Sequence, residues 1–402
     1  MVWWSALPGA VALLALLALV SIFIGYPITV ALLARVRPKP YPQGAEHTMG
    51  MVPGELPRVA VIMSAFNEAA RLPDKIQTLQ GLDYPSERLR FYVSDDASSD
   101  DTWPVLQRLA RDEPRLKLRR NSHNTGKPTN LNRLVEMVDA DGGTDLLVFC
   151  DARQPLAPRS IRALVAPLLD PRVGGATGDL VLPPEPDGSL RGMGLYWRYE
   201  TLLRRSEAAV GSVVGATGAL YVVRREAFVP FEAELVLDAM LLPLRVALDG
   251  RRFVFASGAL AFDVYSDDLG HEFRRKARTL GGLYQAMAFE PRLLRPGTAV
   301  FWAFLFHKVG RLAFPWLMGL MLAGSLGAVA LTPWWTLVWW AWVALVVAQL
   351  GFYVGALLPL PGPLGVLRTL GALMAASWLG WWRWKRGSMR AAWKAGEDRQ
   401  RQ

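Results

Sequence analysis

Three acidic positions, each placed after a short apolar run, constrain the fold of this chain more than any other feature. They are Asp95 with Asp96, Asp151, and Asp238. Carboxylates at the carboxyl ends of buried strands are where α/β proteins place the groups that bind ligands. The pattern therefore predicts an α/β domain with a binding site along one edge of its sheet.

Short strand-like runs alternate with helix-like stretches from Val59 onward, which is typical of a mostly parallel sheet. The predicted strands are 59–63, 89–94, 116–119, 146–150, 173–177, 219–223 and 253–256. The predicted helices are 69–80, 102–111, 129–138, 158–168, 191–209 and 238–248.

The first 34 residues carry no charged side chain, and such a run exceeds the roughly 20 residues that cross a bilayer as a helix. The basic residues Arg35, Arg37 and Lys39 follow the apolar run instead of preceding it, which favours a retained anchor over a cleaved signal peptide. The same residues should stay in the cytoplasm, which places the amino terminus outside and the α/β domain in the cytoplasm.

The apolar character returns after Arg311. Residues 312–331 and 334–360 are long enough to span, whereas 364–384 is interrupted by Arg368. Two spans followed by a re-entrant or interfacial segment would keep the basic tail inside, so we favour that arrangement over three spans. Residues 301–312 should form an amphipathic helix on the cytoplasmic face.

These patterns divide the chain into six predicted parts. They are an anchor at 1–34, a linker at 35–57, an α/β domain at 58–290, an interfacial amphipathic segment at 291–311, transmembrane or re-entrant helices at 312–384, and a basic cytoplasmic tail at 385–402. The chain has a net charge of +10, and many of its basic residues near the carboxyl end alternate with tryptophans. This pattern indicates a lipid bilayer and not a nucleic acid as the partner. The single cysteine, Cys150, excludes an internal disulfide and is expected in the core.

Two loops carry polar groups that suit a nucleotide. Residues 95–101 hold four carboxylates, whose repulsion would be relieved by a bound base, ribose or metal ion, although capping of the next helix explains part of the pattern. Further on, Gly126 permits a tight turn, and Lys127 offers a positive charge for phosphate beside a helix amino terminus.

In this order the motifs resemble those of the family-2 glycosyltransferases, which have the GT-A fold, and the resemblance runs from about Val59 to Gln285. It implies a nucleotide-sugar donor that is held through its nucleoside by Ala65, Asn67, Glu68, Asp95 and Asp96. It also places Lys127 near the diphosphate of that donor.

Asp151 matches the first residue of the family's metal-binding Asp-x-Asp signature, but Arg153 stands at the second position. One carboxylate, water molecules and diphosphate oxygens can still hold Mg²⁺ or Mn²⁺. For Arg153, a phosphate contact and a salt bridge to a neighbouring acid both remain open.

The segment with Gly215, Thr217 and Gly218 resembles the acceptor side of the family's site. Where the family carries two adjacent acids, this chain has Asp238 and then Ala239, and the second position is the catalytic base of inverting members. A methyl group accepts no proton, and neighbouring helical side chains differ in direction by about 100°. Asp238 would replace the base only if the helix start or the acceptor pose differs.

Arg278 matches the arginine of the family's Gln-x-x-Arg-Trp segment, while Arg275 and Thr279 replace the glutamine and the tryptophan. Arg278 would clamp the diphosphate or the acceptor sugar, or it would lie in a basic helix against anionic lipid.

The sequence therefore predicts a multi-pass enzyme of the inner cell membrane, with its catalytic domain in the cytoplasm. It would move a sugar from a nucleotide sugar, with UDP as the expected nucleotide, to a lipid or glycan hydroxyl with inversion, and it leaves open partner subunits of an export system. Because of Ala239, a catalytically silent or engineered nucleotide-sugar-binding protein is the alternative.

Overall fold

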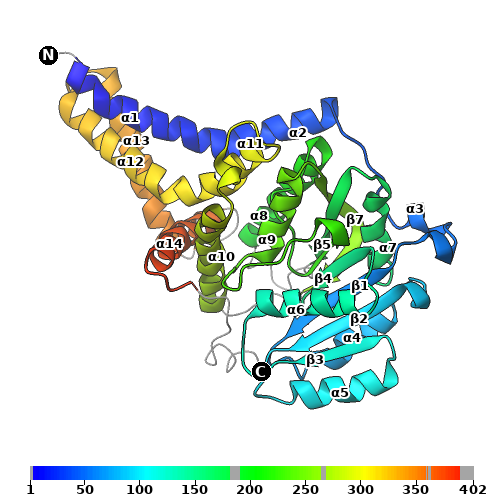
Figure 1. The fold of residues 1–402 in the computed structure, drawn as a ribbon. Coiled ribbons are helices and arrows are strands. Elements are labelled where there is room, and N and C mark those ends of the chain that lie inside the picture. Colours follow the sequence, from blue (N-terminus) through cyan, green and yellow to red (C-terminus); the bar gives the residue numbers. More distant parts are fainter. Residues whose placement is uncertain (1–2, 182–190, 264–268, 359, 361–363, 390–402) are drawn as a thin grey trace.

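The computed structural model describes residues 3–181, 191–263, 269–358, 360 and 364–389. It consists of an α/β domain and a group of long apolar helices that extends away from it (Figure 1). Of the amino-terminal helices, Trp3–Val20 lies within the group of long apolar helices, whereas Tyr26–Val36 runs along the α/β domain before the chain enters the sheet.

The α/β domain is built on a seven-stranded sheet with the strand order β3-β2-β1-β4-β6-β5-β7. The strands are β1 (Val59–Ala65), β2 (Leu89–Asp95), β3 (Leu116–Arg120), β4 (Leu146–Cys150), β5 (Val173–Val181), β6 (Leu220–Arg224) and β7 (Arg252–Phe262). Only β6 runs antiparallel to its neighbours, β4 and β5. This mostly parallel arrangement confirms the predicted GT-A-like fold class and all seven predicted strands.

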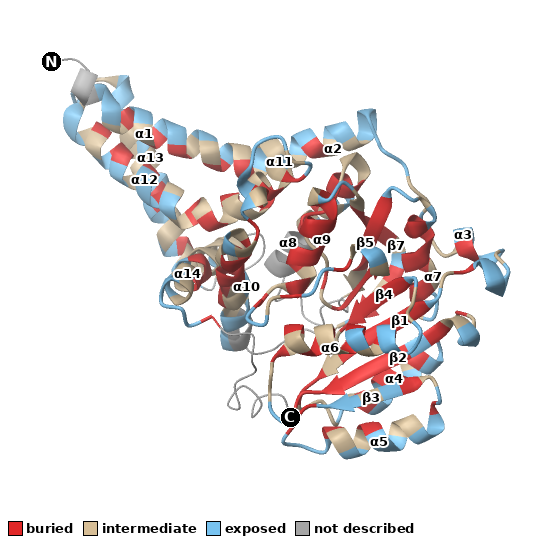
Figure 2. Ribbon diagram, in the orientation of Figure 1, coloured by how far each residue is buried: buried red, intermediate tan, exposed pale blue. Residues whose placement is uncertain are grey.

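The core lies along the central strands, which are buried on both faces (Figure 2). Every residue of β4 is buried, as a parallel strand covered by helices should be. Cys150 at its end is a buried free thiol, as expected. Strands β5 and β7 continue beyond their predicted ends because shifts in their pairing register accommodate extra residues.

Seven helices of the α/β domain and its edge matter for the site. They are α4 (Leu72–Gln80), α5 (Thr102–Asp112), α6 (Lys127–Ala140), α7 (Ser160–Val165), α8 (Arg191–Val210), α9 (Asp238–Leu248) and α10 (Leu269–Phe289). Helix α4 begins three residues later than predicted, where Pro73 occupies a position in the first turn that suits proline.

Three helical segments of the described residues are long and apolar enough to cross a membrane: Ala6–Val36, Phe301–Leu331 and Leu337–Leu357. The first combines α1 (Trp3–Val20), η1 (Ser21–Gly25) and α2 (Tyr26–Val36), and it agrees with the predicted anchor. The second combines α11 (Phe301–Ala303), η7 (Phe304–Val309) and α12 (Gly310–Leu331), and the third is α13. Many leucines of these helices are exposed, as lipid-facing side chains are.

Residues 301–312 are continuous with a longer helix, because η7 continues directly into α12. Their interfacial position stays a prediction. His307 is only 2% exposed and faces α8. The physical reason is that α8 supplies two acidic partners, which the sequence pattern of 301–312 alone does not reveal.

Helix α14 (Gly365–Lys385) lies against α10 and is not among the three apolar helices that could span. The two helices approach closely at glycines, since a Cβ atom on Gly380 would lie 2.6 Å from the backbone nitrogen of Gly281. The ring of Trp384 also stacks on that of Tyr284, with centroids 5.4 Å apart. Whether this third segment crosses the bilayer stays a prediction. The predicted tail beyond residue 389 lies outside the described residues.

Candidate active site

The predicted site residues gather at the carboxyl ends of β1, β2 and β4. Ala65 and Asp95 are paired in the register of β1 and β2, and Asp151 directly follows β4. The loops that leave these strand ends hold the polar groups of the site.

The loops after β1 and β2 are bonded to each other. The backbone nitrogen of Asn67 donates to Ser98 Oγ at 2.9 Å, and the Asn67 side-chain oxygen accepts from the Ser99 nitrogen at 2.9 Å. Asn67 has a φ of 54°, a left-handed conformation that asparagine tolerates better than most residues. The Glu68 nitrogen donates to Thr102 Oγ1 at 2.9 Å. Asn67 and Glu68 therefore shape the edge of the cleft through their backbone as well as their side chains.

Asp95 and Asp96 are completely buried, and among the described residues Oδ2 of Asp95 has no hydrogen-bond partner. Asp96 accepts hydrogen bonds from the backbone nitrogens of Thr125 and Gly126, both at 2.8 Å. Asp95 accepts from the Ser98 nitrogen at 3.0 Å and lies 3.2 Å from Arg120 Nε. Through these bonds the two residues order the surrounding loops. Their contact with a nucleoside stays a prediction.

Lys127 lies between two of the predicted acidic residues. Gly126 has a φ of 83°, which turns the chain so that α6 begins at Lys127. The Nζ atom of Lys127 lies 2.8 Å from Asp151 Oδ1 and 3.3 Å from Asp238 Oδ2. Burial alone would lower the pKa of Lys127, but Asp151 and Asp238 outweigh it and raise the pKa above its usual range. Lys127 is therefore a fixed positive charge.

The acidic residue and the alanine at the start of α9 face different surroundings. Asp238 Oδ2 accepts a hydrogen bond from the Tyr221 hydroxyl at 3.2 Å and faces Lys127, and the side chain is almost fully buried. The Ala239 methyl instead borders the space beside Gly218. A Cβ atom on Gly218 would lie 3.9 Å from Ala239 Cβ and 3.4 Å from Asp151 Oδ2. The position at which the family carries its base thus opens toward Asp151.

The acceptor-side segment is anchored from two directions. The Thr217 nitrogen donates to Thr177 Oγ1 of β5 at 3.0 Å, and the Ala216 nitrogen donates to the Ala239 carbonyl at 2.7 Å. Gly215 has a φ of 154°, at the edge of the region that favours glycine. These bonds hold Gly218 beside Asp151 and Lys127.

Arg153 forms a salt bridge with Asp263, with Arg153 Nη2 2.6 Å from Asp263 Oδ2. Gln154 Nε2 donates to the same oxygen at 3.0 Å. Of the two alternatives for Arg153, the structure shows the contact with an acid. The sequence analysis missed Asp263, because it follows β7 far along the chain and no local motif marks it.

Two further buried groups were missed. The Nζ atom of Lys75, on α4, donates to the Gln154 carbonyl at 2.7 Å and so supports the loop after Asp151 from below. Its place among the apolar positions of α4 was the available signal, since a buried lysine needs a partner. The sequence analysis missed Tyr221 because it lies within an apolar strand and no motif marks it.

Arg278 lies half-buried on α10, and its role stays a prediction.

Asp151 is the one predicted metal ligand, and its side chain is 38% exposed. Among the described residues, no group of three His, Cys, Asp or Glu side chains could hold a metal ion. A divalent cation would therefore need most of its ligands from water and from a diphosphate, a donor set that Mg²⁺ accepts readily.

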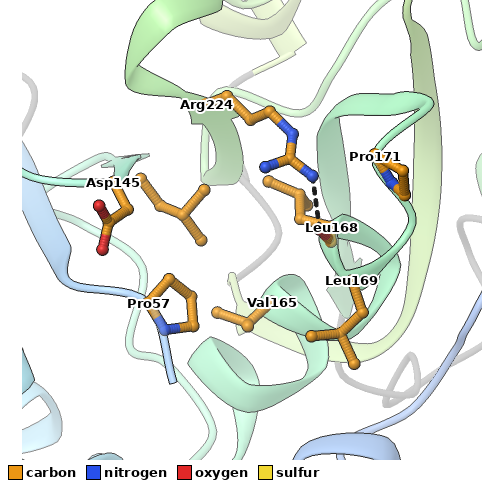
Figure 3. Close-up of a pocket in the computed structure, with 8 residues that line it drawn as sticks. Pro57, Asp145, Val165, Leu168, Leu169, Pro171 and Arg224 are labelled. Atoms are coloured by element: carbon orange, nitrogen blue, oxygen red, sulfur yellow. Dashed lines mark hydrogen bonds between the residues drawn. The ribbon is translucent and has the colours of Figure 1, made fainter. Parts of the chain in front are cut away.

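Two depressions of the surface lie away from this cleft. One, of about 300 Å³, is lined by Pro57, Asp145 and Arg224 at the opposite end of β1 and β4 (Figure 3). Arg224 Nη2 donates there to the Leu168 carbonyl at 2.6 Å. The other, of about 420 Å³, includes Tyr41. Neither is lined by the ion-paired residues around Lys127, so the candidate site rests on the polar groups at the carboxyl ends of the strands.

Comparisons with known proteins agree with the fold and the motifs. Residues 60–228 match the model of glycosyl transferase family 2, and residues 147–354 match that of glycosyl transferase family group 2. The chain therefore belongs to the family-2 glycosyltransferases and is an enzyme of the glycosyltransferase type that uses a nucleotide-sugar donor. The silent-binder alternative is not favoured.

Relatives and structural neighbours are similar over different shares of the chain. An N-acetylglucosaminyltransferase of Rhizobium leguminosarum bv. viciae is 26% identical over 300 residues, which cover 70% of this chain and 69% of that protein. A beta-monoglucosyldiacylglycerol synthase of Trichormus variabilis is 25% identical over 209 residues, which cover 50% and 44%. The structure of the mannosyltransferase PcManGT from Pyrobaculum calidifontis, in complex with GDP-Man and Mn²⁺, aligns with a TM-score of 0.69 and 21% identity, covering 94% of this chain and 99% of that one. At this identity the likeness supports the fold.

Proposed function

We propose that this enzyme transfers a sugar from a nucleotide sugar, with UDP as the first candidate nucleotide, to a hydroxyl group of a membrane lipid or glycan at the cytoplasmic face, with inversion. The observation that carries the proposal is the meeting of Lys127, Asp151 and Asp238 beside Gly218 at the carboxyl edge of the sheet.

The donor would lie across the strand ends. The loops with Asn67 and Asp96 would receive the nucleoside, and the diphosphate would lie near Lys127. The Lys127 ammonium would stabilise the negative charge that develops on the departing diphosphate. Tight hydrogen bonding around Asp95 and Asp96 supports this role, because a preorganised loop loses little entropy when the donor binds.

Asp151 would share a Mg²⁺ or Mn²⁺ ion with the diphosphate oxygens of the donor. Its partly exposed carboxylate beside Gly218 supports this assignment. When bound, the ion would supply positive charge to the leaving group. Arg153 would not contact the donor while it pairs with Asp263, and its role would be to hold the loop after Asp151.

The acceptor would approach along Gly215, Thr217 and Gly218. Its hydroxyl would then lie beside Ala239, whose methyl group accepts no proton. Asp238 does not replace the missing base in this geometry, because its carboxylate faces Lys127 and Tyr221. We therefore expect slow transfer, since general-base catalysis is worth about 10²–10⁴ in rate.

The membrane arrangement supports a lipid-linked or membrane-proximal acceptor. One apolar helix before the catalytic domain and two after it would return the chain to the same side, which keeps both the domain and the basic end of α14 in the cytoplasm. The Trichormus relative is a beta-monoglucosyldiacylglycerol synthase, and the glycolipid in that name fits such an acceptor.

A donor screen tests the function. The purified protein would be heated with UDP-, GDP- and dTDP-sugars in the presence of Mn²⁺, and each donor that raises the melting temperature would be tested for release of its nucleotide. A specific donor should stabilise the fold by mass action. Stabilisation by none of them would contradict the proposed donor site, and binding without any turnover would restore the silent-binder hypothesis.

A further inference from the structure

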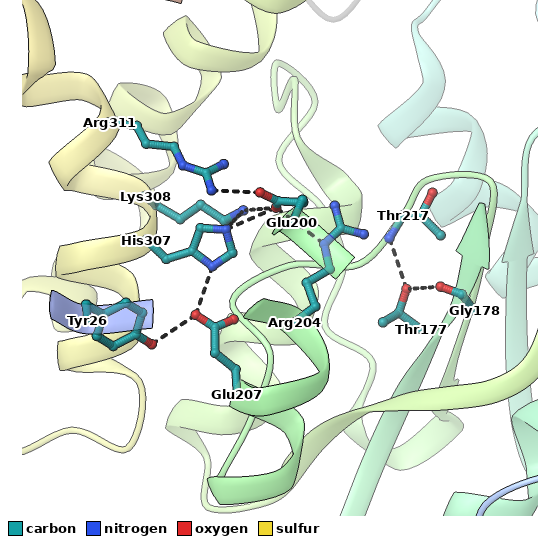
Figure 4. A network of polar contacts seen from close by, with 10 residues as sticks. All are labelled: Tyr26, Thr177, Gly178, Glu200, Arg204, Glu207, Thr217, His307, Lys308 and Arg311. Atoms are coloured by element: carbon teal, nitrogen blue, oxygen red, sulfur yellow. Dashed lines mark hydrogen bonds and ion pairs between the residues drawn. The ribbon is translucent and has the colours of Figure 1, made fainter. Parts of the chain in front are cut away.

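A cluster of charged side chains is buried between the catalytic domain and the membrane helices (Figure 4). We call it the buried ion cluster, and its members are Glu200, Arg204 and Glu207 from α8, and His307, Lys308 and Arg311 from η7 and α12. No part of the proposed chemistry uses these residues. They are costly to bury, so their arrangement calls for a role.

His307 joins the two carboxylates of the cluster. Its Nδ1 atom lies 2.8 Å from Glu207 Oε1, and its Nε2 atom lies 3.0 Å from Glu200 Oε1. Ionised carboxylates only accept hydrogen bonds, so both ring nitrogens can donate only when the imidazole carries both protons. Tyr26 of α2 donates to the same Glu207 oxygen at 2.9 Å. The first and second apolar segments are thus both tied to α8.

Glu200 is surrounded by positive charge. Arg311 Nη2 lies 2.7 Å from its Oε2 atom, while Lys308 Nζ and Arg204 Nε lie 3.6 Å and 3.4 Å from its Oε1 atom. Burial alone would raise the pKa of Glu200, but Arg311, His307 and Lys308 together hold that pKa well below its usual range. Glu200 is therefore an ionised anchor, and the cluster is a network of charges with fixed geometry.

Helix α8 leads directly into the acceptor-side segment. The Gly211 nitrogen donates to the Glu207 carbonyl at 2.8 Å, and Ser212 Oγ accepts from the Phe253 nitrogen of β7 at 3.1 Å. Five residues after Ser212, the Thr217 nitrogen donates to Thr177 Oγ1, and Figure 4 shows this bond in the same view as the cluster. The chain that carries Glu207 into the cluster thus continues to Gly218 beside Lys127.

We propose that the buried ion cluster, with His307 at its centre, positions residues 211–218 relative to the membrane helices. An acceptor embedded in the bilayer would then have its hydroxyl correctly placed beside the donor. This inference rests on the proposed function. His307 is a positioning residue in this scheme and touches no reacting atom. A hydrophobic interface could hold α8 and the membrane helices together equally well, whereas directional ion pairs specify one orientation of α8 relative to those helices.

The test uses the full chain in vesicles of dioleoylphosphatidylcholine with dioleoylglycerol. The variant His307→Gln keeps a polar side chain but offers an oxygen to one of the two carboxylates. We expect faster amide hydrogen exchange in residues 198–218, unchanged KM and kcat for hydrolysis of the nucleotide sugar by water, and transfer to dioleoylglycerol lowered by at least about tenfold, as misplacement of reactants does.

A second substitution provides the rescue. In the double variant His307→Gln, Glu207→Gln, the new amide supplies the missing donor, so exchange in 198–218 and transfer to the bilayer acceptor should return toward those of the parent. The matched control is Arg225→Gln, which breaks an ion pair with Asp139 on another part of the domain. It should leave both readouts unchanged.

The outcomes separate this inference from the proposed function. If His307→Gln leaves exchange in 198–218 as in the parent, the positioning role is wrong, whatever the activity. If exchange rises but water hydrolysis falls as much as lipid transfer, His307 has only a general structural role, and the proposal fails. If the parent turns over no nucleotide sugar, the proposed function fails, while exchange and its rescue still decide whether the cluster fixes 211–218.

Discussion

The Nζ atom of Lys127 lies 3.3 Å from Oδ2 of Asp238, so the one acidic residue at the start of α9 faces a cation inside the cleft. The Tyr221 hydroxyl donates to the same oxygen. Both contacts are made to one oxygen of Asp238, so this side chain lies between Lys127 and Tyr221. We propose on this geometry that Asp238 organises the donor site, and that residue 239 occupies the base position.

Restoring an acid at position 239 should accelerate transfer. The Ala239 side chain borders the space beside Gly218 and Asp151, where an aspartate could accept the proton of an acceptor hydroxyl. We expect Ala239→Asp to raise kcat for transfer, or for hydrolysis of the donor, by at least about tenfold. Ala239→Asn has nearly the same shape without the basicity and serves as the control. Equal rates for the parent and both variants would show that the missing base does not limit turnover.

Removing the carboxylate of Asp151 should weaken divalent-dependent donor binding. Titration calorimetry with the donor found in the screen would compare Asp151→Ala with the parent, each with and without Mn²⁺. We expect Mn²⁺ to increase the affinity of the parent by at least about tenfold and to have little effect on the variant. Asp74→Ala, at an exposed position of α4, is the control. An unchanged Mn²⁺ effect in Asp151→Ala would remove Asp151 from the metal site.

Lys127 should contribute to stability up to strongly alkaline pH. Its pKa is raised in the folded state, so its contribution is complete below the unfolded pKa of about 10.4 and is lost only as the pH rises through the higher folded value. The variant Lys127→Met keeps the length of the side chain and leaves Asp151 and Asp238 without their shared cation.

We expect the variant to melt at a lower temperature than the parent. The difference in melting temperature should be constant between pH ~7 and ~10 and should decrease above that range. A difference that vanishes already near pH ~8 would contradict the raised pKa. Donor affinity of the variant should also fall by at least about tenfold, because a charge-assisted contact with phosphate is lost.

Arg153 should matter for stability more than for donor affinity. The variant Arg153→Ala leaves the buried carboxylate of Asp263 without this ion-pair partner, which we expect to destabilise the fold by about 1–3 kcal/mol. The double variant Arg153→Ala, Asp263→Asn should recover part of the loss, as thermal unfolding would show. A large loss of donor affinity with no loss of stability would instead favour the phosphate contact.

The sequence predicted the strands and helices of the α/β domain well because local patterns determine them. Short apolar runs such as 146–150 form strands wherever helices cover both faces of a sheet, and the carboxyl ends of parallel strands must lie on one edge. Local patterns also predicted the apolar helices that could span a membrane, since an uncharged run such as 1–34 has few stable alternatives. The amphipathic pattern of 301–312 did not reveal the partners of its charges, because these lie about a hundred residues earlier, on α8.

By itself, therefore, the sequence determined the fold class, the apolar helices, the edge of the sheet that carries the site and the absence of an acid at position 239. Only the tertiary structure decided which charges pair. In the folded chain Asp238 pairs with Lys127, Arg153 pairs with Asp263, and His307 contacts two glutamates. Asp95 and Asp96 accept hydrogen bonds from the backbone of the loops around them. The physical reason is that hydrophobic periodicity is a property of neighbours along the chain, whereas an ion pair depends on the direction and burial of side chains that packing brings together.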